Sequence, residues 1–132
     1  MLAELINVLI QSGLKIDRTK AIDVLQQREK LGSTGIGDGV AIPHGKVPDL
    51  SELVVAFGRS REGISFDAID GKPAHLFFLL LAPENSTGQH LKALARISRM
   101  LKTPDFRRKL LDADTTSDLY KAIIEQDESC PV

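Results

Sequence analysis

Cysteine and tryptophan are almost missing from this chain of 132 residues, which has one cysteine, Cys130, and no tryptophan. A single cysteine cannot form a disulfide within the chain, so a disulfide-stapled scaffold is excluded and a reducing, cytoplasmic location is expected. Long apolar runs are missing too, because the longest, Leu76 to Ala82, is far too short to cross a bilayer. The N-terminus also lacks the basic and then apolar pattern of a signal peptide.

The chain has no excess of charge of either sign. Its 17 Lys and Arg residues against 18 Asp and Glu residues give a formal net charge of −1. A chain without a basic stretch is not expected to bind nucleic acid or to insert into a membrane. With 42% hydrophobic and 27% charged residues, the composition is that of a soluble globular protein. We expect residues 1–132 to form a single domain.

Glycine is concentrated in one segment. Residues 32–46 hold five of the ten glycines and lead into the pair Pro43-His44. Glycine lets the backbone come close to another group, and exposed N–H groups can then cradle an anion. Pro43 fixes its own φ and favours an extended Ile42, which presents His44 from a stiff strand end. The combination indicates a histidine that handles a phosphoryl group.

Helices are predicted on both sides of a central group of strands. Apolar spacing and capping residues predict helices over Leu2–Gly13, over Asp17–Gly32, over Asn85–Leu101, after Thr103 and after Thr115/Thr116. Strands are predicted at Val40–Ile42, Leu53–Phe57 and Leu76–Leu81, and Ile64–Ile69 is weakly extended. This order predicts an α/β fold, a three-layer α/β/α sandwich with a mixed β-sheet flanked by helices.

Two of these elements carry more specific expectations. Leu76–Leu81 has no polar alternation, which predicts a central strand covered on both faces. The last helix is expected to face inward through Leu119, Tyr120, Ile123 and Ile124. Residues 127–132 are expected to form a frayed tail.

His44 is the first candidate for chemistry. A neutral imidazole keeps a lone pair on one ring nitrogen and is a competent nucleophile near pH 7. Its other ring nitrogen needs a hydrogen bond that fixes the tautomer and the ring orientation. The sequence does not show which group supplies that bond.

Two further candidates each have an alternative interpretation. His90 falls in the first turn of a predicted helix and would donate a hydrogen bond to a phosphoryl group, or else it is a solvated residue with no role. Arg28 ends the helix before the glycine segment. Its guanidinium would meet two phosphate oxygens, or else it complements the helix C-terminus.

The remaining candidates are weaker. Ser33 and Thr34 would donate hydroxyls to a phosphate or only cap the turn, and Gly45 would offer its backbone N–H. His75 precedes an apolar strand and is taken as structural. The three histidines and one cysteine match no zinc spacing, so no metal is expected. Gly35-x-Gly37-x-Gly39 has the wrong spacing for a dinucleotide fingerprint, so no cofactor is expected.

These residues resemble a known family. Residues 28–37, running into 41–46, look like the active-site segment of EIIA domains of the phosphoenolpyruvate-dependent phosphotransferase system, of the fructose/mannitol/nitrogen-regulatory type. Residues 66–71 and 90–95 resemble the same family at the matching places, and the similarity covers essentially the whole chain. The sequence of residues 66–71 and the lack of fused transporter domains are both more typical of the nitrogen-regulatory EIIA-Ntr branch than of the sugar-specific branches. Family members usually carry an N-terminal segment with a strand, which we expect to be absent here.

The resemblance implies a function. His44 would be phosphorylated through its Nε2 atom by a phosphohistidine on a small carrier, HPr or its nitrogen-branch relative NPr, and His90 and Arg28 would line the site. The protein would then act as a regulator whose partners read the phosphorylation state of His44. The alternative is a sugar-specific component that passes the group to the EIIB domain of a permease. A third reading is a small anion-binding domain without transfer.

Overall fold

The computed structural model describes residues 2–32, 34–48, 50–64 and 70–129. The chain divides into two compact units, Met1–His90 and Leu91–Val132. The first unit holds the β-sheet and its two N-terminal helices, and the described part of the second unit is mainly helical. The single domain predicted over residues 1–132 stays a prediction.

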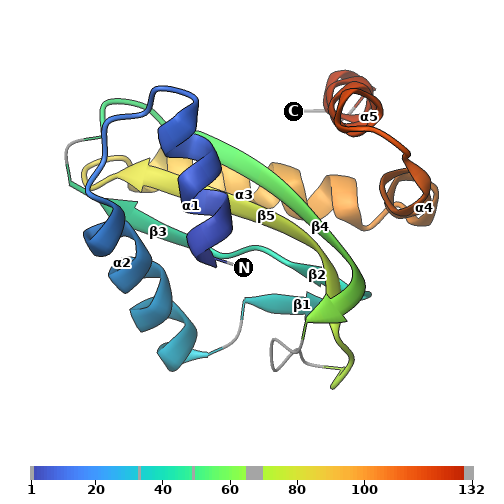
Figure 1. The fold of residues 1–132 in the computed structure, drawn as a ribbon, viewed down its shortest axis with the longest axis horizontal. Coiled ribbons are helices and arrows are strands. Elements are labelled where there is room, and N and C mark those ends of the chain that lie inside the picture. The colour runs from blue at the N-terminus through green and yellow to red at the C-terminus, as the bar shows by residue number, and fades with distance from the viewer. Residues whose placement is uncertain (1, 33, 49, 65–69, 130–132) are drawn as a thin grey trace. The chain divides into compact units, whose positions relative to one another are not determined.

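Two helices open the first unit (Figure 1). Helix α1 spans Leu2–Gln11 and helix α2 spans Arg18–Leu31. The predicted cap of α2 is confirmed, because the Asp17 side chain accepts a hydrogen bond from the N–H of Lys20. Gly32 follows the last turn of α2 with a φ of 154°, which is where the predicted helix ends.

The strands form one mixed sheet. The strands are β1 Gly35–Gly37, β2 Val40–Ala41, β3 His44–Val47, β4 Val54–Ile64 and β5 Ala74–Pro83. Strand β5 pairs antiparallel with β4 and parallel with both β2 and β3, and β1 pairs antiparallel with β2. Strands β2 and β3 therefore follow one another along the same neighbour, interrupted at Ile42 and Pro43. The Pro43 carbonyl still accepts a hydrogen bond from the N–H of Leu80, at 2.9 Å.

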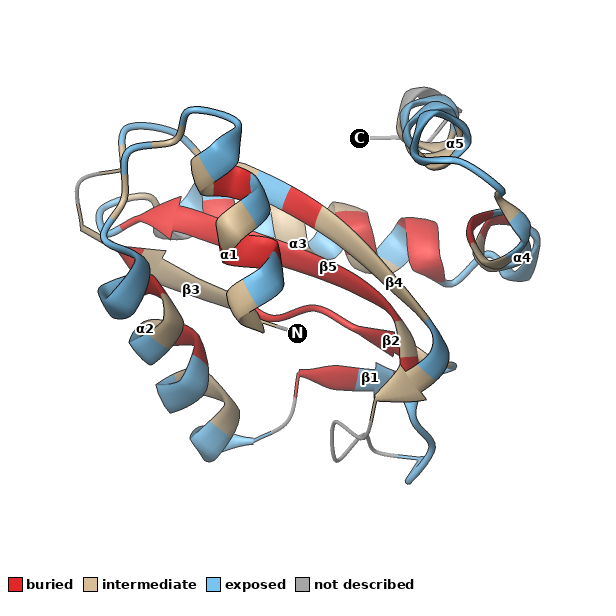
Figure 2. Ribbon diagram, in the orientation of Figure 1, coloured by how far each residue is buried: buried red, intermediate tan, exposed pale blue. Residues whose placement is uncertain are grey.

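The core of the first unit lies against β5. Every residue of β5 except His75 is buried, and Figure 2 shows the strand red along almost its whole length. This confirms the central strand predicted from the apolar run. Helix α1 packs against α2 and β4, and α2 packs against β3. Both helices bring apolar side chains to the cluster that includes Phe77, such as Ile6 and Leu25.

The second unit contains most of α3 and two more helices. Helix α3 spans Thr87–Leu101, so its first turn belongs to the first unit, and α4 Pro104–Asp112 and α5 Thr116–Ser129 follow. The Thr115 hydroxyl accepts the N–H of Asp118 and caps α5 as predicted. An ion pair between Arg96 and Asp127 joins α3 to α5.

The structure confirms the predicted α/β class and mixed sheet and corrects several details. The glycine segment contains β1, and β3 begins at His44, where no strand was predicted. The strand predicted to end at Phe57 continues to Ile64. The rest of the weakly extended segment, residues 65–69, lies outside the described residues.

The C-terminal predictions are wrong in two respects. Helix α5 continues to Ser129, so the predicted frayed tail does not begin at Asp127. The Tyr120 side chain, expected to face inward, is 66% exposed, and Ile124 is 38% exposed. Apolar spacing alone therefore placed too many residues of α5 on its buried side.

Candidate functional site

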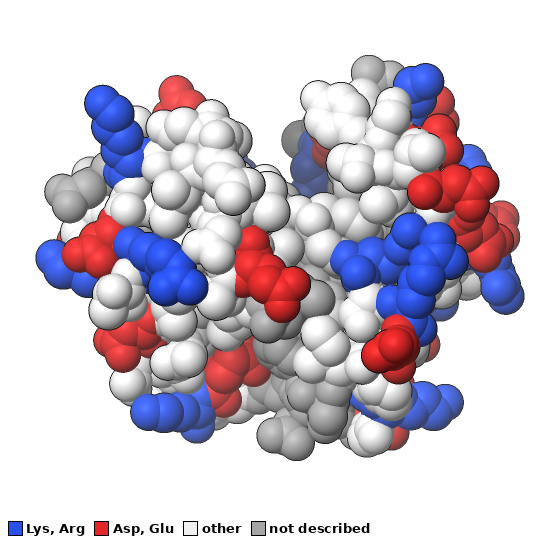
Figure 3. Space-filling view, viewed as in Figure 1, with Lys and Arg blue, Asp and Glu red and all other residues white. Residues whose placement is uncertain are grey.

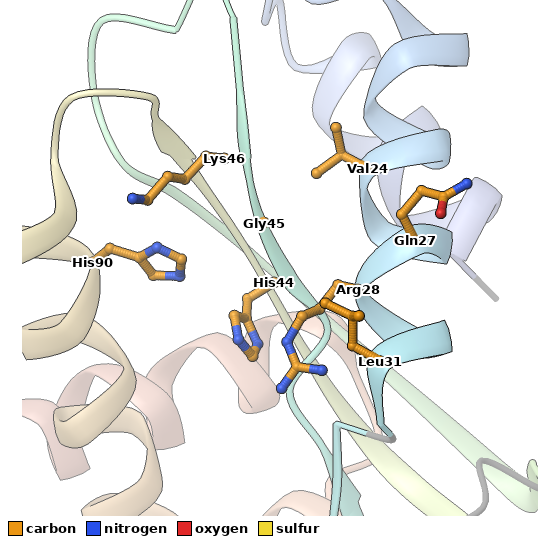
Figure 4. A pocket seen from close by; sticks show the side chains of 8 residues that line it. All are labelled: Val24, Gln27, Arg28, Leu31, His44, Gly45, Lys46 and His90. Atoms are coloured by element: carbon orange, nitrogen blue, oxygen red, sulfur yellow. The ribbon is translucent and has the colours of Figure 1, made fainter.

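A pocket of about 510 Å³ lies between α2, β3 and the first turn of α3, all within the first unit (Figure 4). The residues that line it are Val24, Gln27, Arg28, Leu31, His44, Gly45, Lys46 and His90. The structure thus brings together His44, His90 and Arg28, the three main candidates from the sequence, and adds Gly45. These segments are far apart in the chain and meet because α2 packs on β3.

His44 is held by the backbone just before it. Its Nδ1 atom lies 2.7 Å from the carbonyl oxygen of Ile42. A carbonyl only accepts hydrogen bonds, so Nδ1 carries the proton and donates to Ile42. The lone pair is therefore on Nε2, the atom expected to react. Ile42 is the partner that the sequence left unidentified.

His90 faces His44 from the first turn of α3. The two ring centroids are 5.4 Å apart in an edge-on arrangement, with an angle of 75° between the ring planes. His90 is only 7% exposed, so it is not the solvated residue of the alternative interpretation. Its buried Nε2 has no hydrogen-bond partner among the described residues. Burial lowers the pKa of His90 below its ordinary value, and the charges of His44 and Lys46 lower that pKa further.

Arg28 forms a hydrogen bond at the C-terminal end of α2 and also lines the pocket. One guanidinium nitrogen donates to the carbonyl of Gly32, at 2.8 Å, which matches the expectation that Arg28 complements the C-terminus of α2. Figure 4 shows the Arg28 side chain extending from α2 toward the strand that carries His44, and both side chains line the pocket. A guanidinium has five N–H donors, so a bond to Gly32 leaves it able to contact an anion in the pocket.

Gly45 allows α2 to lie close to β3. A Cβ atom placed on Gly45 would be 2.5 Å from Cγ1 of Val24, which is far inside van der Waals contact. Val24 stands one helical turn before Arg28 on α2. The missing side chain at Gly45 therefore sets the distance between the helix that carries Arg28 and the strand that carries His44.

The other predicted supports lie elsewhere. Thr34 is 4% exposed and is not among the residues that line the pocket. Its hydroxyl and its N–H both donate to the carboxylate of Glu29. Ser33 lies outside the described residues. His75, taken as structural, donates from Nδ1 to the carbonyl of Ser60, at 2.9 Å, and does not line the pocket.

The contacts of Glu29, Val24 and the Ile42 carbonyl were not predicted from the sequence. Glu29 and Thr34 are five residues apart, on either side of the end of α2. No standard sequence motif predicts a hydrogen bond at this spacing. The only available signal was a polar residue, Thr34, directly before the glycine-rich strand β1. A polar residue at such a place needs a partner if it is buried.

The surface and the helices add two observations. On the face shown in Figure 3, acidic and basic side chains are interspersed, in agreement with the net charge of −1. Within the part of the chain that the structure describes, no helix combines the length and the apolar character needed to cross a bilayer.

The fold and the pocket define a small α/β protein in which a histidine with its lone pair on Nε2 shares a pocket with an arginine. The family model for the phosphoenolpyruvate-dependent sugar phosphotransferase system, EIIA 2, matches residues 1–126. The chain belongs to this family, which confirms the resemblance seen in the sequence.

Relatives from both branches of the family are similar to the chain. It is 48% identical over 101 residues to a nitrogen regulatory protein of Bradyrhizobium diazoefficiens, covering 76% of this chain and 66% of that protein. It is 42% identical over 124 residues to a PTS system fructose-specific EIIA component of Haloferax volcanii, covering 92% of this chain and 80% of that protein. It is 38% identical over 125 residues to a fructose-specific EIIABC component of Bacillus subtilis, covering 95% of this chain but only 20% of that protein.

Solved structures agree with the fold. The nitrogen regulatory protein IIA-Ntr of Neisseria meningitidis matches with a TM-score of 0.83 and 38% identity, covering 92% of this chain and 83% of that chain. Enzyme IIAMTL of Escherichia coli, solved in complex with phosphorylated enzyme IIBMTL, matches with a TM-score of 0.76. That match covers 94% of this chain and 85% of the other at 19% identity, so it supports the fold alone.

Proposed function

We propose that the protein is a phosphohistidine carrier that accepts a phosphoryl group on Nε2 of His44. The observation that carries this proposal is the 2.7 Å contact between His44 Nδ1 and the Ile42 carbonyl. It assigns the ring proton to Nδ1 and leaves a nucleophilic Nε2 in a pocket shared with Arg28 and His90. Family membership supports the same chemistry.

The proposed step exchanges one N–P bond for another. The Nε2 lone pair of His44 attacks the phosphorus of a phosphohistidine on the donor protein. The donor N–P bond breaks, and its electron pair returns to the donor imidazole. The His44 ring then has a proton on Nδ1 and a phosphoryl group on Nε2, so it carries positive charge, which the Ile42 carbonyl stabilises.

The neighbours of His44 would hold the transferred group. Phosphoryl transfer asks little covalent chemistry of a protein, so positioning and charge stabilisation dominate. In the proposal, the Arg28 guanidinium donates to phosphoryl oxygens, and the buried Nε2–H of His90 donates to a further oxygen of the same group. Ser33, Thr34 and the Gly45 backbone stay predicted supports, and Thr34 would act from its bond to Glu29.

The partners are part of the proposal. The donor would be HPr or its nitrogen-branch relative NPr, and the regulated partner would be a target protein that binds differently to phosphorylated and unphosphorylated His44. The similarity to nitrogen regulatory proteins from Bradyrhizobium and Neisseria favours this branch. The cytoplasmic location expected from the single cysteine belongs to the same proposal.

A sugar-specific role is the second candidate. The match to the fructose-specific EIIA component of Haloferax volcanii covers 92% of this chain and 80% of that protein. The mannitol enzyme solved with its phosphorylated IIB partner shares the fold. In this reading, phosphorylated His44 would pass its group to an EIIB domain rather than regulate a target.

Intact-mass spectrometry tests the carrier chemistry. The protein is incubated with phosphoenolpyruvate, enzyme I and HPr or NPr, beside a His44→Ala control. One acid-labile phosphoryl adduct on the wild type alone is expected. A folded wild type that gains no adduct from an active relay would contradict carrier function and favour an anion-binding domain. Adding purified fructose or mannitol EIIB domains to the phosphorylated protein then separates the branches, because only a sugar-specific component would lose its adduct rapidly.

A further inference from the structure

A continuous series of hydrogen bonds runs from Glu29 to His44. The Glu29 carboxylate accepts both the N–H of Thr34, at 3.2 Å, and the Thr34 hydroxyl. The Thr34 carbonyl accepts the N–H of Ile42 at 3.0 Å. The Ile42 carbonyl in turn accepts Nδ1–H of His44 at 2.7 Å. The series links the last turn of α2 to the imidazole that is proposed to react.

We infer that Glu29 is a positioning residue for His44 and acts through Thr34 and Ile42. Its carboxylate fixes Thr34, Thr34 fixes the Ile42 peptide, and Ile42 fixes the tautomer and orientation of the imidazole. The consequence for phosphoryl transfer rests on the proposed function. The effect on the His44 tautomer does not depend on that function.

Ile42 depends on Thr34 because the sheet is interrupted at this point. Strand β2 ends at Ala41 and β3 begins at His44, so the regular pairing with β5 does not include Ile42. Its N–H goes to Thr34, not to β5. Pro43, the next residue, has no N–H with which to anchor the chain. The Ile42–Pro43 peptide is therefore held by Thr34 on one side and, on the other, by the Pro43 carbonyl, which accepts the N–H of Leu80.

Thr34 in turn depends on Glu29. Thr34 is 4% exposed, so its polar groups have little access to water and must be paired within the protein. A carboxylate that accepts two hydrogen bonds from one residue fixes that residue more firmly than a single neutral bond would. The neighbouring Arg28 holds the carbonyl of Gly32 at the same helix end. Two consecutive side chains of α2 thus hold the start of the glycine segment.

A purely structural role for Glu29 makes a different prediction. If Glu29 only fastened α2 to the sheet, its loss would lower stability but leave the His44 tautomer unchanged. If it positions His44, its loss would release the Ile42 carbonyl and allow the Nε2–H tautomer, whose Nε2 has no lone pair to attack with. The tautomer therefore separates the two roles.

The test measures the two imidazole nitrogens of His44 by ¹⁵N NMR in the unphosphorylated full chain. The variants are Glu29→Ala, Thr34→Val, which removes the hydroxyl, and Thr34→Ser, which keeps it. Glu125→Ala, at an exposed helical glutamate of α5, is the matched control. Transfer rates from phosphorylated HPr or NPr are measured in parallel, and thermal unfolding monitors the fold.

The Nδ1–H tautomer is expected in the wild type, Thr34→Ser and Glu125→Ala. Glu29→Ala and Thr34→Val should show an added Nε2–H population. Their kcat for transfer should fall about tenfold, the scale on which partners that orient an imidazole act, with KM changed less than about twofold. If Glu29→Ala does not fold, the comparison of Thr34→Val with Thr34→Ser decides. Folded variants with a wild-type tautomer would overturn the inference. A wild type that accepts no phosphoryl group would overturn the proposed function instead. The tautomer measurement would still decide whether Glu29 positions His44.

Discussion

The Nδ1 atom of His44 and the carbonyl oxygen of Ile42 are 2.7 Å apart, although only Pro43 separates the two residues in the chain. This local contact arises where the strand beside β5 is interrupted, between β2 and β3. A side chain at an ordinary strand position would find the nearby carbonyls already paired in the ladder. The interruption frees one carbonyl for the imidazole, so the fold itself selects the ring nitrogen that keeps its lone pair.

Gly45→Ala should destabilise the protein and slow phosphoryl acceptance together. The new Cβ would meet Cγ1 of Val24 at 2.5 Å, so α2 must move away from β3 and carry Arg28 with it. We expect a loss of about 1–3 kcal/mol in the free energy of unfolding, as for other overpacked cores. Chemical denaturation and the rate of adduct formation measure the two effects.

Two further variants control this experiment. Val24→Ala combined with Gly45→Ala removes the clash and should recover part of both losses. Gly88→Ala is the matched glycine control, because a Cβ there has no heavy atom within 4 Å. It should leave stability unchanged or slightly increased, as expected for alanine in a helix. Equal losses in Gly45→Ala and Gly88→Ala would show that close packing on β3 is not the cause.

Much of the fold could be predicted because local signals and tertiary structure agree. The Asp17 cap, the Gly32 helix end and the fully apolar β5 each report a local requirement that the structure satisfies. The α/β class followed from the order of these elements. The pocket was predicted only as a set of residues, because sequence patterns indicate His44, His90 and Arg28 but not the distances between them.

The missed elements depend on pairing with other segments of the chain, whether near in sequence or far from it. Strand β1 is mostly glycine and is a strand only because β2 pairs with it. The second half of β4 is polar, yet its backbone pairs with β5, as Arg59 does with Leu76. β-Structure of this kind is decided by cross-strand partners more than by intrinsic preference. The bond between Glu29 and Thr34 was invisible for the same reason, because no sequence pattern shows that a helix end and a strand start will meet.

Arg28→Lys should slow phosphoryl acceptance about tenfold, and Arg28→Ala about a hundredfold. Lysine keeps the charge but has no planar fork, so it cannot bind the Gly32 carbonyl and contact the phosphoryl oxygens from one rigid group. Rates of adduct formation from phosphorylated donor measure the effect. Lys30→Ala, at an exposed residue of the same helix end, is the control and should keep the wild-type rate. Equal rates in Arg28→Ala and Lys30→Ala would remove Arg28 from the proposed machinery.

Asp17→Ala should affect stability and leave the site intact. The carboxylate caps α2 through the N–H of Lys20, at the opposite end of the helix from Arg28. Removing such a cap costs about 1 kcal/mol. Asp17→Asn or Asp17→Ser, which keep a capping oxygen, should recover most of that loss. The rate of adduct formation, measured well below the unfolding temperature, should match the wild type. A slower rate would show that the start of α2 is coupled to the pocket.

His90 should make stability depend on pH below neutrality. Its pKa in the folded protein is lowered, first by burial and then by the charges of His44 and Lys46, whereas an unfolded histidine titrates near its ordinary value of about 6.5. Between these two pKa values the unfolded chain binds more protons than the folded one, so the free energy of unfolding falls as the pH drops through that window. Above the unfolded pKa both states are neutral at this position, and the penalty disappears.

Denaturation curves of the wild type and of His90→Gln between pH 8 and about pH 5 test this sign. Glutamine cannot take up the proton, so the variant should lose less stability on acidification than the wild type, even if it is less stable at pH 8. Gln89→Ala, at an exposed residue of the same turn, should keep the wild-type slope. Parallel slopes for wild type and His90→Gln would mean that His90 is as easily protonated in the folded protein as in the unfolded chain. In that case His90 would carry charge in mildly acidic solution and would contact a phosphoryl group on His44 as a cation rather than as a neutral donor.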